Sequence, residues 1–251
     1  MAKCSPLATV WAPGTRRAID LAAGSVTFGD VPLGTLRRSH VERWVKTMEA
    51  RKLAPGTIHT RTANVRSVLR GAVGDRVIAT DSSKGVKLPR RRRAEAAMTI
   101  PTVEQVGQLL AVGDGSFRAF IGLCAFAGLR LGEAAGVQVG DIDFLRRTLN
   151  VERQIQREGP GFEVREPKHG SERIVYLAPD LVAMLTEHIR LFRPGKDASR
   201  WLFTGEGQDP PHQNTVGHRW RTTRTKAGVE GMRLHDLRHF YASASMPGAM
   251  S

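Results

Sequence analysis

The chain has 251 residues, and its hydrophobic content of 41% is enough to bury a core in one or two globular domains. Its 38 lysines and arginines outnumber its 24 aspartates and glutamates, so the formal net charge of +14 favours a polyanionic partner, although GC-rich genomes also encode Arg-rich proteins. Two distant cysteines exclude a disulfide framework, and the lack of a long apolar run excludes a membrane span and a signal peptide, so a reduced cytoplasm is expected.

The N-terminal third begins with a segment, residues 1–29, whose weak periodicity predicts little order. A first helix is expected over residues 33–53. Ser39 and Glu42 have the spacing of a capping box. The apolar stripe of this helix follows the i, i+3, i+4, i+7 pattern and consists of Val41, Trp44, Val45 and Met48.

A second helix is expected after the break at residues 53–57, opened by Pro55 or Thr57. Its apolar stripe consists of Ile58, Thr62, Val65, Leu69 and Val73, and its other face carries His59, Arg61, Arg66 and Arg70. On an isolated helix that basic face would be a solvated surface. Residues 74–88 are expected to close a helical domain over residues 30–88 with a short helix and a turn.

A basic linker is predicted over residues 89–98, because Pro89 is followed by four consecutive cations: Arg90, Arg91, Arg92 and Arg93. Four like charges repel one another and cannot pack in a core. They form either a solvated tether or a contact with a phosphate backbone, and the two readings are compatible.

A second domain, residues 99–251, is predicted to start with a helix capped by Thr102 and Gln105, whose apolar face contains Val103, Val106, Leu109 and Leu110. A strongly apolar helix follows over residues 117–127, and Cys124 is expected to be buried in it. Gly128 lets the backbone turn tightly before a helix that carries Arg130.

Strands are expected within residues 141–151 and at residues 162–166 and 173–177, the last two flanking a hairpin turn with Lys168 near its tip. They predict a small antiparallel sheet on a mainly helical domain. A helix capped by Asp180 should follow, then a short apolar segment at 201–203. The remaining elements are a basic helix at 214–227, which carries Arg219 and Arg221, and a helix at 234–241.

Three clusters of functional side chains occur in order: AGLRLGE at 127–133, PKHGSERIVYL at 167–177 and RLHDLRHFY at 233–241. His235 and Arg238 are three residues apart, which places both on one helix face. A guanidinium fork beside an imidazole suits a phosphate group, because the first donates several hydrogen bonds and the second moves a proton near neutral pH.

These three clusters resemble the Arg box, the hairpin lysine and the H-x-x-R box of the tyrosine recombinases, and within them the phage-type integrases of actinobacterial style. The resemblance covers about residues 30–245. It implies a mainly α fold with a small antiparallel β-sheet. A helical core-binding domain and an α+β catalytic domain would form a two-domain clamp on double-stranded DNA.

The resemblance also implies phosphodiester exchange without a metal or another cofactor. Arg130 and Arg238 would clamp the phosphate oxygens, Lys168 would act as general acid, and His235 would assist proton transfer. Simpler readings exist: Arg130 could pair only with Glu133, and Lys168 could be a solvated turn residue. His235 and His239 have a zinc-ligand spacing, but a third ligand is not evident.

The implied partners are double-stranded DNA and other recombinase protomers on it, with neither a membrane nor a small-molecule substrate. DNA contacts are expected from the basic helix face, the linker and the helix at 214–227, through Arg61, Arg66, Arg70, Arg90, Arg91, Arg92, Arg93, Arg219 and Arg221.

The sequence departs from the family pattern after Tyr241, where neither a Gly-His box nor a further tyrosine follows. The two tyrosines are Tyr176 and Tyr241, and Tyr241 is expected to be a packing residue. The sequence therefore predicts a C-terminally truncated member that is inactive alone. The alternative function is a non-catalytic DNA-binding remnant or a competitor of a complete integrase.

Overall fold

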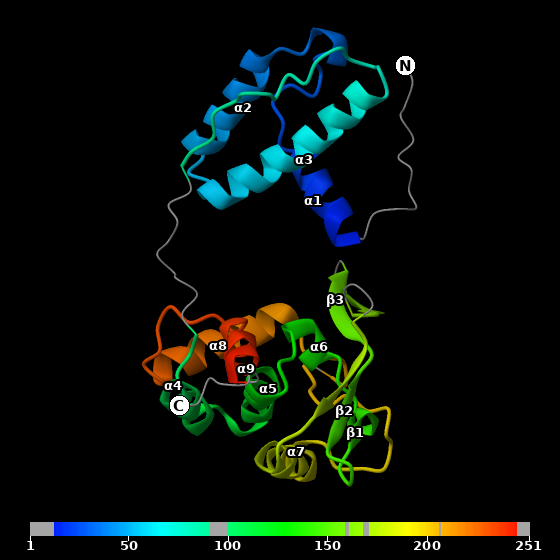
Figure 1. Ribbon diagram of the computed structural model, residues 1–251, viewed down its shortest axis with the longest axis vertical. Helices are drawn as coiled ribbons and strands as arrows, with labels where there is room; N and C mark the ends of the chain where they lie inside the picture. Colours follow the sequence, from blue (N-terminus) through cyan, green and yellow to red (C-terminus); the bar gives the residue numbers. More distant parts are fainter. Residues whose placement is uncertain (1–12, 91–99, 159–160, 168–170, 206, 245–251) are drawn as a thin grey trace. The chain divides into compact units, whose positions relative to one another are not determined.

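The computed structural model describes residues 13–90, 100–158, 161–167, 171–205 and 207–244 (Figure 1). The chain forms two compact units, Met1–Glu95 and Ala96–Ser251. The first is helical, and the second combines helices with two small antiparallel sheets. Within the described ranges, no helix is both long and apolar enough to cross a membrane.

The first unit packs around one face of each of its long helices. Its elements are α1 (Pro13–Ala23), η1 (Leu33–Thr35), α2 (Arg38–Ala50) and α3 (Pro55–Gly74). The predicted stripe of α2 is buried, with Trp44 fully enclosed, and Pro55 opens α3 at its first position as predicted. The α3 stripe is also buried, except that Val73 is only partly covered.

Three details of the first unit differ from the prediction. Ser39 does not cap α2, because the helix starts at Arg38 and Glu42 pairs instead with Arg38, at 2.7 Å from Nε to Oε1. The helix α1 lies in a segment predicted to have little order, and it is held by tertiary contacts such as the 3.1 Å hydrogen bond from Asn64 Nδ2 to the Ala18 carbonyl. Residues 75–90 form turns and no helix.

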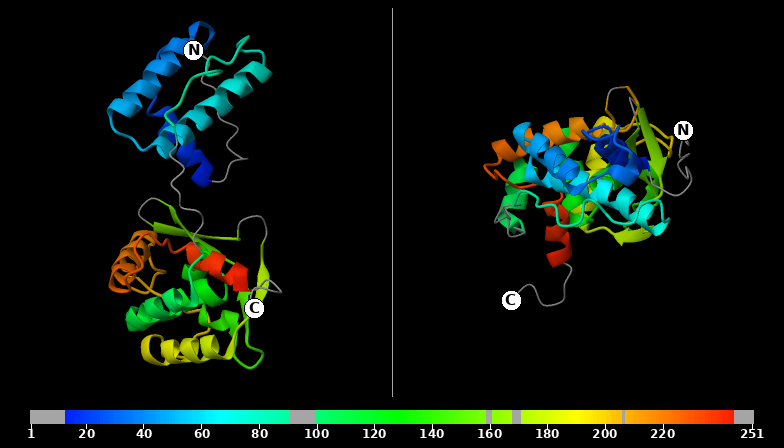
Figure 2. Two further views of the ribbon diagram at one scale, coloured as in Figure 1. Left: turned by 60° about the vertical axis from the view of Figure 1, so that its left-hand side comes forward. Right: turned by 90° about the horizontal axis from the view of Figure 1, so that it is seen from above.

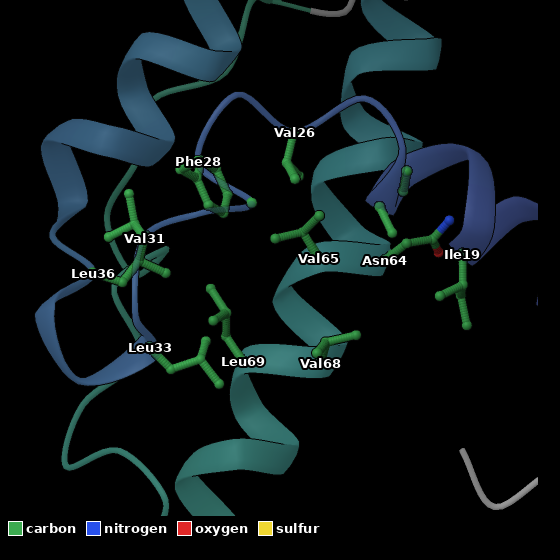
Figure 3. Close-up of a pocket in the computed structure, with 13 residues that line it drawn as sticks. Ile19, Val26, Phe28, Val31, Leu33, Leu36, Asn64, Val65, Val68 and Leu69 are labelled. Carbon is green, nitrogen blue, oxygen red and sulfur yellow. The ribbon is translucent and has the colours of Figure 1, made fainter. Parts of the chain in front are cut away.

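An apolar pocket of about 210 Å³ opens in the first unit between α1, the segment 24–36 and α3 (Figure 3). Val26, Phe28 and Leu36 line it from the segment that joins α1 to α2. Val65 and Leu69 line it from α3, and both also belong to the core. The core of this unit is therefore continuous with an accessible apolar hollow.

The second unit is built around α5 (Gly115–Phe126), which is almost fully buried from Phe117 onward. It packs against four other helices, α4 (Val103–Val112), α6 (Leu131–Ala135), α7 (Pro179–Phe192) and α9 (Asp236–Ala244), while α8 (Gln213–Lys226) packs on α4 (Figures 1 and 2). The Gln105 amide donates to Thr102 Oγ1 at 3.3 Å and the Thr102 amide to Gln105 Oε1 at 3.0 Å, which confirms the predicted capping box.

Two predictions about these helices are wrong. The apolar pattern places Val103 on the buried face of α4, but Val103 is the first residue of the helix and is 66% exposed. Asp180 does not cap α7. The cap position belongs to Ala178, and Pro179 opens the helix, since its missing amide costs nothing there. The prediction that Cys124 is buried is confirmed, and burial raises the pKa of its thiol to about 12.

The strands in the described ranges form two antiparallel sheets. The three-stranded sheet has the order β1 (Ile142–Asp143), β2 (Thr148–Val151) and β5 (Arg173–Tyr176), and the two-stranded sheet joins β3 (Gln154–Glu158) to β4 (Gly161–Arg165). The two strands predicted to flank one hairpin, β4 and β5, therefore pair with different partners. The strand β3 was missed because Ile155 is its only apolar residue. The prediction of antiparallel β-structure on a mainly helical chain is confirmed, but the described strands form two small sheets where one was predicted.

Candidate active site

The junction of α5 and α6 places Arg130 at the surface of the second unit. Gly128 has φ of +63°, which confirms the predicted tight turn, and Leu129 is buried below it. A Cβ atom on Gly128 would collide with the ring of Tyr241, so a larger residue would require the ring to shift. Arg130 then occupies the N-cap position of α6 with its side chain 36% exposed.

The Glu133 carboxylate lies beneath Arg130 and is 1% exposed. Its Oε1 accepts from Arg130 Nη1 at 2.6 Å, and its Oε2 accepts from the Arg130 amide at 3.0 Å and from Arg173 Nη2 at 2.8 Å. Burial opposes ionisation, but hydrogen bonds from Arg173 and from the amide and guanidinium of Arg130 outweigh it and lower the pKa of Glu133 to about 2. The carboxylate is therefore charged at neutral pH.

Arg238 lies in α9 and donates from Nη1 to the Gly128 carbonyl. Burial lowers the pKa of Arg238, and the positive charge of nearby Arg130 lowers it further. An arginine remains charged in spite of such a shift. The structure thus brings together the two guanidiniums that the sequence singled out, Arg130 and Arg238, beside one buried carboxylate.

His235 precedes α9 on the same segment as Arg238. The start of α9 is fixed by Asp236, whose Oδ2 accepts from the Arg233 amide at 2.8 Å. The rings of His235 and His239 are 4.9 Å apart at an angle of 80°. Burial lowers the pKa of His235, and the positive charges of His239 and Arg238 lower it further. A neutral imidazole has one donor and one acceptor nitrogen, so it can pass a proton in either direction.

Metal binding by this histidine pair finds no support in the geometry. Among the residues that the structure describes, no three His, Cys, Asp or Glu side chains form a group that could hold a metal ion.

Lys168 lies outside the described residues, and the neighbouring segment contains a residue that sequence reasoning had not singled out. Arg173 donates to Glu133 and, from Nη1, to the Ser171 carbonyl at 3.3 Å. The strand geometry sets its direction, because Arg173 alternates with the exposed Ile174 and shares a face with the buried Val175.

The predicted DNA-binding arginines have different surroundings. Arg70, Arg90 and Arg221 are exposed, and Arg61 is half-buried. Arg66 donates to the carbonyls of Ser83 and Val86, at 3.2 Å each, so it fastens the segment after α3. Arg219 pairs with Asp114 and lies 4.7 Å from the Phe117 ring centre. Arg91, Arg92 and Arg93 lie outside the described residues.

The two tyrosines lie in different surroundings. Tyr176 is 80% exposed and points outward from β5. Tyr241 lies in α9 with its ring directly against the backbone of Gly128, a packing contact of the kind that the sequence predicted.

Comparison with known proteins places most of the second unit in one family. Residues 101–246 match the model of the phage integrase family. The prophage phiRv2 integrase of Mycobacterium tuberculosis (strain CDC 1551 / Oshkosh) is 24% identical over 220 residues, which cover 85% of this chain and 56% of that protein. The tyrosine recombinase XerC of Mycobacterium sp. (strain KMS) is 26% identical over 234 residues, 86% of this chain and 71% of the relative. The chain thus spans about half the length of the first relative.

Solved structures show the same fold. The Tn1549 transposon integrase in complex with transposon right end DNA has a TM-score of 0.77 at 19% identity, covering 95% of this chain and 84% of that one. A lambda integrase dimer bound to a COC′ core site has a TM-score of 0.67 at 14% identity, covering 94% and 81%.

Proposed function

Because the chain belongs to the phage integrase family of tyrosine recombinases, we propose that it binds double-stranded DNA and holds a scissile phosphodiester for site-specific recombination. The proposal rests on one observation: the guanidiniums of Arg130 and Arg238 lie close together beside the buried carboxylate of Glu133. With Arg173, three guanidiniums surround one carboxylate, and the resulting excess of positive charge suits a phosphate group.

The proposed chemistry needs no metal. Attack of a tyrosine hydroxyl on phosphorus forms a new P–O bond and breaks the bond to the 5′-oxygen. The hydroxyl gives up its proton with the assistance of His235, and the 5′-oxygen takes up a proton as it leaves. Arg130 and Arg238 stabilise the charge that builds on the non-bridging oxygens. Lys168 donates the proton to the leaving 5′-oxygen, and His235 supports the phosphate and assists proton transfer.

The proposed binding mode is a two-domain clamp. A helical domain, residues 30–88, and a catalytic domain, residues 99–251, contact the duplex and are joined by the basic linker 89–98. The exposed Arg70, Arg90 and Arg221 support this mode, as do the DNA complexes of the Tn1549 and lambda integrases. A lambda integrase tetramer is bound to a Holliday junction, which supports further protomers on the same DNA.

DNA binding is tested by its dependence on salt, measured as fluorescence anisotropy with a labelled duplex pool. If the chain neutralises about 6–10 phosphates, affinity should fall by about 10³-fold or more between about 50 and 200 mM salt. Arg221→Gln should reduce the slope of log affinity against log salt by about one. Arg190→Gln is the matched control, because Arg190 is exposed on α7 and pairs with Glu187. A flat response of the wild-type chain would refute DNA binding.

A second candidate function follows from the surroundings of the tyrosines. Tyr176 projects outward from β5, and Tyr241 is packed on Gly128. We propose that neither is the nucleophile, so that residues 1–251 by themselves bind DNA without cleaving it.

Cleavage is tested by incubating the chain with nicked duplexes that trap a covalent intermediate, followed by a denaturing gel. No protein–DNA adduct is expected from the wild-type polypeptide. An adduct that disappears in Tyr241→Phe or Tyr176→Phe would identify that residue as the nucleophile and overturn the second candidate.

A further inference from the structure

Arg173 faces the interior of the second unit from an edge strand. It lies at the start of β5, opposite Val151 of β2, and its side chain is 27% exposed. Val175, on the same face, is buried, while Ile174 and Tyr176 are 64% and 80% exposed on the other face. Because strand residues alternate between faces, the register of β5 fixes the direction of Arg173.

The target of Arg173 is the oxygen of Glu133 that does not bind the Arg130 guanidinium. Oε2 accepts from Arg173 Nη2 at 2.8 Å, and Oε1 accepts from Arg130 Nη1 at 2.6 Å. Each guanidinium therefore has its own oxygen. Without Arg173, both oxygens become available to Arg130, whose fork prefers a bidentate pair with a carboxylate. That arrangement would turn the Arg130 donors away from the surface and toward Glu133.

The same guanidinium also contacts the backbone at Ser171. Arg173 Nη1 donates to the Ser171 carbonyl at 3.3 Å, and Ser171 is three residues after Lys168. A planar fork reaches two acceptors in fixed directions, whereas a lysine ammonium is a single charged point. Lysine at position 173 would keep the charge but lose this double contact.

We propose that Arg173 is a positioning residue, which holds Arg130, through Glu133, in the orientation that binds the scissile phosphate. The inference rests on the proposed function, since it assigns Arg173 a role at the same phosphate site. Arg173 contacts Glu133 and Ser171, and its effect on the phosphate is exerted through Arg130.

The test uses DNA duplexes that carry one neutral methylphosphonate linkage at successive positions. The parent duplex is isolated from a random pool by its binding to the wild-type chain. Neutralising the phosphate bound by Arg130 should lower the affinity of the wild-type chain by about 10-fold. The same neutralisation should leave the affinity of the Arg130→Met variant unchanged, and this difference identifies the phosphate. In Arg173→Lys this loss should shrink to about 2-fold, while losses at other phosphates remain.

Arg153→Lys is the matched control. Arg153 also forms a partly buried ion pair, 2.5 Å from Nη1 to Oδ2 of Asp141, and among the described residues the pair makes no hydrogen bond or ion pair with Arg130 or Glu133. In this variant, neutralising the phosphate bound by Arg130 should still lower the affinity by about the full 10-fold. The control therefore shows whether weakening any arginine–carboxylate pair is enough to reduce that loss of affinity.

Glu133→Asp supplies a second variant, because it keeps the charge and shortens the bridge by one methylene. If Arg173 acts through Glu133, this variant should also shrink the loss to about 2-fold. If neutralising this phosphate still lowers the affinity of Glu133→Asp or of Arg173→Lys by about 10-fold, the positioning role is overturned. If the wild-type chain shows no loss at any phosphate, the proposed function itself fails and the positioning role fails with it.

Discussion

Glu133→Ala is expected to lower the free energy of unfolding of the second unit by about 3–5 kcal/mol, the usual range for removing one partner of a buried ion pair. The carboxylate is 1% exposed and accepts from both Arg130 and Arg173. Its removal leaves two guanidiniums near each other and near Arg238, with no anion between them. Urea denaturation followed by circular dichroism measures the change.

The matched control is Asp143→Ala. Asp143 pairs with Arg146 at 3.6 Å and accepts from the Arg146 amide at 2.8 Å, but both side chains are exposed, so the expected loss is only about 1 kcal/mol. Equal losses in the two variants would contradict the view that Glu133 is the electrostatic centre of the site.

The same carboxylate makes the free energy of unfolding depend on pH. Its folded-state pKa of about 2 is below the ordinary value of 4.5, so the stabilisation is complete above pH 4.5 and is lost as the pH falls toward 2. A shift of this size corresponds to about 3 kcal/mol. Stability measured between these pH values should fall less in Glu133→Gln than in the wild-type chain.

Local patterns predicted much of the fold because their causes lie within one turn or one helix. The stripe around Trp44, the Thr102–Gln105 capping box and the turn at Gly128 each depend on neighbouring residues. The same local reasoning grouped Arg130 with Glu133 and His235 with Arg238. It failed for Val103, since the burial of a helix face depends on which element covers it.

Long-range contacts account for what the sequence did not predict. The helix α1 is fastened by Asn64, which is 46 residues away from Ala18. The strand β5 pairs with β2, and this pairing turns Arg173 toward Glu133, 40 residues earlier in the chain. Strand pairing of this kind depends on register and tertiary packing, so spacing in the sequence did not reveal Arg173 as part of the site.

Gly128→Ala is expected to destabilise the second unit by about 2–5 kcal/mol. A non-glycine residue at a φ of +63° costs about 1–2 kcal/mol, and overpacking adds about 1–3 kcal/mol because the new Cβ would collide with the Tyr241 ring. Since the Gly128 carbonyl accepts from Arg238, the same shift should weaken DNA binding. Urea denaturation and fluorescence anisotropy measure the two effects.

Two further variants separate the backbone cost from the collision. Gly228→Ala has a similar φ of +69° with no atom within 4 Å of the new Cβ, so it should lose only the conformational part, about 1–2 kcal/mol. Tyr241→Ala removes the ring with which the new Cβ collides. The double variant with Gly128→Ala should therefore lose about 1–3 kcal/mol less free energy of unfolding than the sum of the two single variants. Strict additivity would mean that the ring moves aside without cost, and that φ alone makes glycine necessary at the turn before Arg130.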